Sequence, residues 1–96
     1  MACYAIAQST ITDHAQMERY IADAIPTLEA HGVKILAFDD APTVIEATVE
    51  HARTVLLEFE SEQAFRAWYD SAEYRAAREL RESASAGSFI LVKGTE

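Results

Sequence analysis

The segment Arg53-Thr54-Val55-Leu56-Leu57-Glu58-Phe59 is the most strongly apolar stretch of the chain and predicts a central β-strand. Its odd positions from 55 to 59 are all apolar, and Leu56 adds an apolar side chain to the opposite face. Helices packed on a sheet of this kind cover one of its two faces. The segment therefore predicts a sheet with a second apolar face that needs a partner.

Four further strands are expected from short apolar or alternating runs. They span residues 3–8, 33–38, 43–50 and 89–93. The sequence Asp-Asp-Ala-Pro at residues 39–42 predicts the turn of a hairpin between the second and third of these strands. Residues 85–88, which contain serine and glycine, predict a loop before the last strand.

Three helices are expected from apolar residues at spacings of three and four. Their N-terminal caps are predicted at Thr12 or Asp13, at Ser61 and at Ser71. Gly32 is expected to stop the first helix. Pro26 predicts a kink or an early break near Ile25, because proline lacks a backbone donor.

The region from Ser61 to Ser83 is either one bent helix or two, and two are favoured. The order strand, helix, three strands, helical region and strand matches the ferredoxin-like α+β plan with one additional hairpin strand. A chain of 96 residues has the size of one domain, so residues 1–96 are expected to form a single one. The helices should lie on one face of an antiparallel sheet. Pairing of two uncovered sheet faces then predicts a homodimer, a dimeric α+β barrel.

The charge of the chain argues against polyanionic partners. Asp and Glu number 16 against 8 Lys and Arg, and the formal net charge is −8. Nucleic acid and anionic membranes are not expected as partners, because phosphate recognition needs clustered basic residues. The chain has no apolar run of membrane-spanning length and no signal-peptide pattern at its start. Cys3 is the single cysteine and cannot form an internal disulfide, so we expect it to be a buried, inert thiol. A chain without an internal disulfide suits the reducing cytoplasm, where we expect this protein.

A set of residues spread over most of the chain forms a recognisable pattern. It consists of Glu58-Phe59, Ser61, Ala64, Trp68-Tyr69-Asp70-Ser71, Glu73-Tyr74 and Arg81, preceded by His31-Gly32 and Glu46 and followed by Gly94. This pattern resembles the domain of unknown function 1330 family. The resemblance implies a dimeric α+β barrel, as in small monooxygenases and muconolactone isomerases, and for most members no established activity. Val33 and Ala47 stand where that family usually has glycines.

Two residues are candidates for moving a proton. Glu58 lies in the apolar strand, where a carboxylate must be paired, exposed at a cleft or protonated, so it is a candidate general acid or base. The alternative for Glu58 is an ion pair with Arg53 or Arg81. His31 precedes Gly32, where an imidazolium would cap the helix. Its alternative role is proton transfer, which the family resemblance supports.

Arg81 and four aromatic residues are candidates for holding a ligand. Arg81 lies two helical turns after Tyr74, so the two share one face of a helix. There a guanidinium can clamp a substrate carboxylate or enolate, or it can satisfy Glu58 or a backbone carbonyl. The aromatic residues form either the core and interface or the walls of a ligand site, and they are Tyr20, Trp68, Tyr69 and Tyr74.

No metal or cofactor is predicted, because the chain has no zinc-type spacing of ligands, no phosphate-binding loop and no dinucleotide glycine pattern. Two function classes remain open. One is a cofactor-independent enzyme for a small organic acid, lactone or aromatic metabolite, in which Glu58 or His31 moves a proton and Arg81 stabilises negative charge. The other is a non-catalytic dimeric module for binding or an accessory role.

Overall fold

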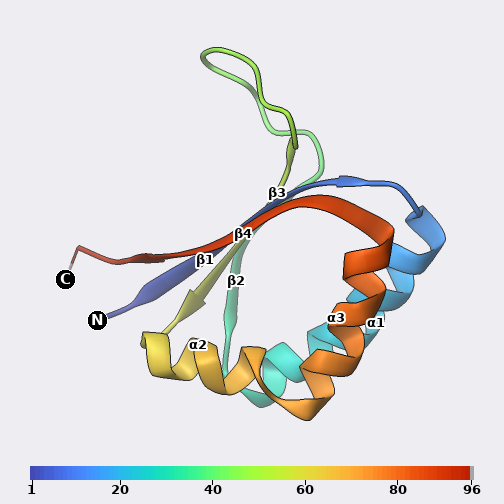
Figure 1. Ribbon diagram of the computed structural model, residues 1–96. Helices are drawn as coiled ribbons and strands as arrows, with labels where there is room; N and C mark the ends of the chain where they lie inside the picture. Colours follow the sequence, from blue (N-terminus) through green and yellow to red (C-terminus); the bar gives the residue numbers. More distant parts are fainter. Residues whose placement is uncertain (96) are drawn as a thin grey trace.

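The protein is built as a four-stranded antiparallel sheet with three helices (Figure 1). The computed structural model describes residues 1–95. Its elements in chain order are β1 (Cys3–Ile11), α1 (His14–Ala30), β2 (Lys34–Asp39), β3 (Arg53–Phe59), α2 (Glu62–Tyr69), α3 (Ala72–Ala84) and β4 (Ser85–Lys93). The strand order is β2-β3-β1-β4, so β3 is an inner strand. The predicted ferredoxin-like α+β fold is confirmed.

Each helix begins at a side chain that caps its first turn. The carboxylate of Asp13 accepts a hydrogen bond from the backbone N–H of Gln16 at 3.0 Å. The hydroxyls of Ser61 and Ser71 accept from the N–H groups three residues further on, at 3.1 and 3.3 Å. These bonds satisfy amides that have no partner inside the helix. The two separate helices predicted after Ser61 are confirmed, because α2 ends at Tyr69.

A glycine ends α1. Gly32 has a φ of 67°, and its N–H donates to the carbonyl of Glu29 at 3.1 Å. The N–H of Val33 donates to the carbonyl of Leu28 at 3.0 Å. This pair of bonds satisfies the last carbonyls of the helix and needs the left-handed conformation at Gly32 alone. Val33 does not adopt a positive φ, so the backbone at position 33 does not require glycine.

The early break predicted in α1 is wrong, because the helix continues through Pro26 to Ala30. Proline removes one backbone hydrogen bond from the helix interior. Ala24, Thr27 and Leu28, which flank the proline, are all buried. Packing of this segment against the core therefore outweighs the missing hydrogen bond.

The strand predicted over residues 43–50 is wrong. This segment belongs to a loop of residues 40–52, which joins β2 to β3 and stands away from the sheet on the side opposite the helices (Figure 1). β2 pairs directly with β3, with Lys34 opposite Glu58, so the hairpin closes without a further strand. β-branched residues favour a strand only where a neighbouring strand completes the ladder. In this loop Ala47 has a φ of 62°, a left-handed conformation that favours glycine.

The loop predicted over residues 85–88 is also wrong, because β4 begins at Ser85 directly after α3. β4 pairs with β1 along its whole length. A glycine is required within this ladder, since a Cβ at Gly87 would clash with the carbonyl oxygen of Gln8. The hydrogen bonds of a nine-residue ladder outweigh the weak strand preference of serine and glycine.

The two faces of the sheet differ in what covers them. Odd-numbered side chains of β3, such as Leu57 and Phe59, pack under the helices in a core that includes Trp68 and Tyr74. Even-numbered side chains point to the other face, where no helix lies within residues 1–95 (Figure 1). On that face Ile90 of β4 is 52% exposed. The uncovered apolar face predicted from residues 53–59 is therefore present in the single chain.

Candidate functional site

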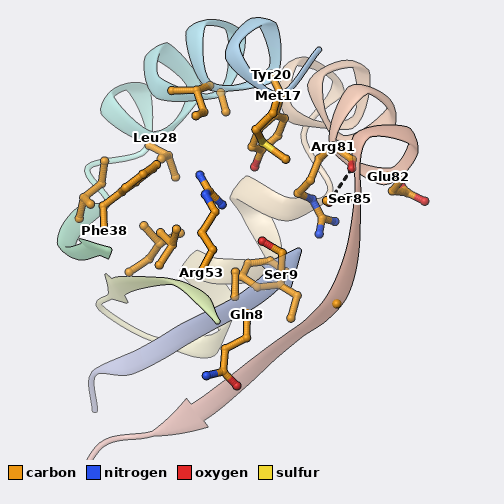
Figure 2. A pocket seen from close by; sticks show the side chains of 18 of the residues that line it. Gln8, Ser9, Met17, Tyr20, Leu28, Phe38, Arg53, Arg81, Glu82 and Ser85 are labelled. Carbon is orange, nitrogen blue, oxygen red and sulfur yellow. Dashed lines mark hydrogen bonds between the residues drawn. The ribbon is translucent and has the colours of Figure 1, made fainter. Parts of the chain in front are cut away.

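A cavity of about 340 Å³ lies between the helix-covered face of the sheet and helices α1 and α3 (Figure 2). Its apolar walls include Met17, Ile21, Ala24, Leu28, Val55, Leu57, Trp68 and Phe89. Its polar side chains come from both layers and include Ser9, Tyr20, Arg53, Tyr74 and Arg81. An apolar cavity of this volume with a few converging polar groups is typical of sites for small organic ligands.

Two phenols meet at the helix side of the cavity. The hydroxyl oxygens of Tyr20 and Tyr74 are 3.0 Å apart, and their rings meet edge to face. Burial raises the pKa of both phenols above its ordinary value, and Tyr74 raises that of Tyr20 further. The charge of Arg81 acts in the opposite direction on both pKa values but does not outweigh burial. Both phenols are therefore neutral near pH 7, and because one donates to the other, one hydroxyl hydrogen remains for a ligand.

Two polar atoms of the cavity wall are buried without a partner. They are the Nε of Arg81 and the Oγ of Ser9, and no other buried side-chain nitrogen or oxygen of residues 1–95 lacks a hydrogen bond. Arg81 descends from α3 toward Ser9 of β1 (Figure 2). Nearly all buried polar groups in proteins have hydrogen-bond partners, so an unpaired donor and hydroxyl on one cavity need an explanation.

The indole of Trp68 forms a rigid part of the wall. The ring is 1% exposed, and its Nε1 donates to the hydroxyl of Thr27 at 3.0 Å. The same hydroxyl donates to the carbonyl of Ala24 at 2.6 Å. The Tyr74 ring lies against Trp68, with 3.9 Å between the ring centroids. Hydrogen bonding and packing together hold the indole in one orientation.

Arg53 is a site residue that the sequence interpretation considered only as a possible partner of Glu58. It is 9% exposed and rises from β3 into the centre of the cavity (Figure 2). Its Nε donates to the carboxylate of Asp40 at 3.0 Å. The signal that identifies it is the alternation of β3, because position 53 shares the face of Val55 and Leu57.

Glu58 lies on the opposite face of the sheet from this cavity. Its carboxylate is 3.7 Å from the Nζ of Lys34, and its side chain is 27% exposed. No ion pair joins it to Arg53 or Arg81 within the described chain. The strand alternation explains this position, since Glu58 is an even-numbered residue of β3.

His31 and Tyr69 also lie outside the cavity. His31 is exposed at the end of α1, where its Nδ1 is 3.0 Å from the carbonyl oxygen of Thr27, and it borders a more open groove between α1 and α3. Tyr69 stacks on Phe65, and the guanidinium of Arg78 lies 4.6 Å from the centre of its ring. The structure thus brings Tyr20, Trp68, Tyr74 and Arg81 to one cavity. The Tyr69 ring packs against Trp68 and Tyr74 without lining that cavity, and His31 and Glu58 lie elsewhere.

No three His, Cys, Asp or Glu side chains among residues 1–95 are grouped so that they could hold a metal ion. No helix in this part of the chain is long and apolar enough to cross a membrane. The cavity residues supply neutral phenols, a hydroxyl and two guanidinium groups. This set can bind and stabilise an anionic oxygen of an organic molecule.

Comparison with known proteins places the chain by family and by fold. The family model described as "Domain of unknown function (DUF1330)" matches residues 2–95. No match was found among curated proteins. A solved structure of a protein of unknown function from Rhodopseudomonas palustris has a TM-score of 0.84 and 16% identity, over 99% of this chain and 83% of that chain.

Two further similar structures are those of an oxygenase and of a candidate monooxygenase. SnoaB, a cofactor-independent oxygenase from Streptomyces nogalater, has a TM-score of 0.68 and 11% identity, over 99% of this chain and 94% of that chain. A candidate antibiotic biosynthesis monooxygenase from Caulobacter crescentus has a TM-score of 0.64 and 16% identity, over 99% and 92% of the two chains. At these identities the likeness shows the shared fold alone and says nothing about activity.

Proposed function

This chain belongs to the DUF1330 family, whose description assigns no activity, and we propose from its cavity that it binds a small organic carboxylate, lactone or aromatic metabolite and acts on it without a cofactor. The observation that carries the proposal is the pair of unpartnered buried atoms, the Nε of Arg81 and the Oγ of Ser9. A ligand oxygen between them would supply the missing hydrogen bonds. The fold shared with SnoaB, a cofactor-independent oxygenase, is consistent with this class of function.

The cavity is suited to stabilising negative charge on a ligand oxygen. Arg81 supplies a permanent positive charge, and the Tyr20–Tyr74 pair supplies one free hydroxyl hydrogen. The raised pKa values keep both phenols neutral, so they donate hydrogen bonds and do not repel an anion. A carboxylate, an enolate or a phenolate would be stabilised in such an environment. The proposed chemistry is therefore transfer of a proton from a carbon next to a carbonyl, or from a phenol, to a base that reaches the cavity from solvent, with Arg81 stabilising the charge left on the ligand oxygen.

Proton transfer by His31 or Glu58 would require a ligand that extends beyond this cavity. Neither residue lines the cavity of its own chain. The acidic side chain among the cavity residues is Glu82, whose carboxylate is 3.2 Å from the Nε of Arg78. This shortage of a free base favours the second candidate function, a non-catalytic binding or accessory module that uses the same cavity.

Binding can be measured through Trp68, which is the single tryptophan and lies in the cavity wall. Benzoate, a small aromatic carboxylate, should change its fluorescence in a saturable manner. Arg81→Met should weaken benzoate binding about tenfold or more, because a charge-assisted hydrogen bond is lost. Arg75→Met is the matched control, since Arg75 is exposed on the same helix and lies outside the cavity. Equal affinity of wild type and Arg81→Met would contradict the proposal.

Turnover can be separated from binding with an enolisable ligand. Phenylpyruvate carries a carboxylate, an aromatic ring and exchangeable methylene hydrogens. An enzyme of the proposed class should accelerate exchange of those hydrogens in D₂O, and Arg81→Met should lose the acceleration. Saturable binding of phenylpyruvate without faster exchange would favour the accessory module.

We also propose that the chain works as a homodimer through its uncovered sheet face. Ile90 and Val92 of β4 are 52% and 37% exposed on that face, next to Ile6 and Leu56 of the inner strands. A contiguous apolar patch on the surface of a folded chain marks an interaction site. Light scattering should show a dimer at micromolar concentration, and Ile90→Lys should shift it to a monomer. Ala76→Lys, on an exposed helix surface, should leave the mass unchanged.

A further inference from the structure

Arg53 has more hydrogen-bonding capacity than the chain uses. An arginine side chain carries five N–H donors. The Nε–H of Arg53 donates to Asp40 at 3.0 Å, and the guanidinium lies 4.5 Å from the centre of the Phe38 ring. Among the described residues, Asp40 is its single hydrogen-bond partner. The two terminal nitrogens of this side chain, which is 10% exposed, are therefore left for another acceptor.

Arg53 and Arg81 enter the same cavity from opposite layers. Arg53 rises from β3 toward α1, and Arg81 descends from α3 toward the sheet (Figure 2). Ser9 of β1 lies beside Arg53 in the sheet, because it is opposite Arg53 in β3 and opposite Gly87 in β4. Both arginines line the cavity together with Tyr20, and the charge of each acts to lower the pKa of that phenol. The cavity thus has a cationic group on each of two walls.

The negative charge inside the cavity does not balance these two cations. The formal net charge of the chain is −8, yet the acidic residue among the cavity residues, Glu82, pairs with Arg78. Asp40 is 74% exposed and neutralises Arg53 from the solvent side. A buried guanidinium is costly unless an anion and hydrogen bonds compensate it. One anionic group on a ligand would pair with Arg81, and the terminal nitrogens of Arg53, which are not among the fully buried unpartnered atoms, would remain open to a second acceptor in the cavity.

We propose that the ligand of this cavity is a small organic dianion, with one acidic group on Arg81 and the second on the terminal nitrogens of Arg53. The apolar wall between them, with Trp68 and Leu57, suits a ring or another rigid apolar body. An aromatic dicarboxylate has this chemistry. The inference rests on the proposed function and narrows its ligand class. Asp40 keeps its bond to Nε in the complex, because that bond does not use the terminal nitrogens.

Trp68 fluorescence titration of the full-length protein with benzoate, isophthalate and terephthalate tests the inference. The two dicarboxylates differ in the distance between their acidic groups. At physiological ionic strength, wild type should bind one of them at least about tenfold more tightly than benzoate. Arg53→Met should abolish this preference. Arg66→Met, which removes an exposed arginine outside the cavity, should retain it.

Arg53→Lys extends the test if loss of the Arg53–Asp40 ion pair prevents Arg53→Met from folding. Lysine keeps the charge but cannot present two parallel donors, so the preference for the dicarboxylate should fall several-fold. Binding of benzoate as tightly as both dicarboxylates would overturn the inference and leave the proposed function intact. A preference that survives replacement of Arg53 would also overturn it. Failure of all three probes to bind would overturn the inference and the proposed function together.

Discussion

Replacement of Thr27 by valine should destabilise the protein by isolating a buried indole donor. Valine has the shape of threonine, so no cavity forms, but the acceptor of the Trp68 Nε1–H bond at 3.0 Å is lost. Trp68 is 1% exposed and Thr27 is 7% exposed, so the indole donor stays in a buried environment without its acceptor. An unsatisfied buried donor costs about 1–3 kcal/mol. At about 2.1 cal/mol/K of unfolding entropy per residue, that cost lowers the Tm of a chain of this length by about 5–15 °C.

Urea denaturation followed by circular dichroism, at one fixed protein concentration, measures this effect. Trp68→Phe removes the indole donor, so Thr27→Val should cost much less in that background than in wild type. The double-mutant cycle should therefore give a coupling energy of about 1–2 kcal/mol. If Thr27→Val is as stable as wild type, or if its cost is the same in both backgrounds, the hydrogen bond does not hold the cavity wall as argued.

Three further predictions concern the phenols and two backbone positions. Tyr20 and Tyr74 have raised pKa values in the folded chain, whereas tyrosine in the unfolded chain has a pKa of about 10. Below pH ~10 both states keep the phenols protonated, and the contribution of the phenols to stability is fully present. As pH rises above ~10 only the unfolded chain ionises, so stability falls. Absorbance at 295 nm should show these two phenols ionising only on alkaline unfolding, and Tyr20→Phe should flatten the alkaline loss of stability. Gly87→Ala should cost about 2–4 kcal/mol in urea denaturation, because its Cβ would clash with the Gln8 carbonyl; an unchanged midpoint would refute the ladder geometry. Ala47→Gly should raise stability by up to about 1 kcal/mol by removing a positive φ from alanine, and a loss of stability would contradict the φ of 62°.

Local sequence signals predicted the helices well because caps act within a single turn. Asp13, Ser61 and Ser71 bind amides three residues away, so their partners are contained in the sequence pattern itself. Gly32 ends α1 for the same reason. The break predicted at Pro26 failed because burial of the residues around it is a property of the folded core.

Strand prediction failed where pairing over long distances decided the outcome. Residues 43–50 have strand-forming side chains but no neighbouring strand to complete a ladder. Residues 85–88 have the composition of a loop but pair with β1 along the sheet. A strand is stable only through its partner, and the partner can lie anywhere in the chain.

The candidate site was predicted in part. Tyr20, Trp68, Tyr74 and Arg81 were selected as polar or aromatic residues on apolar helix faces, and the structure brings them to one cavity. Arg53 was overlooked as a site residue, although its odd position in β3 places it on the buried face.

The sequence by itself determined the fold class, the caps and the presence of a sheet with two apolar faces, because these depend on periodicity and on contacts within a few residues. Only the tertiary structure decided that Arg53 and Arg81 share a cavity while Glu58 and His31 lie elsewhere. The reason is physical: helix α3 and strand β3 belong to different layers, and the packing of one layer on the other determines which of their side chains face the same cavity.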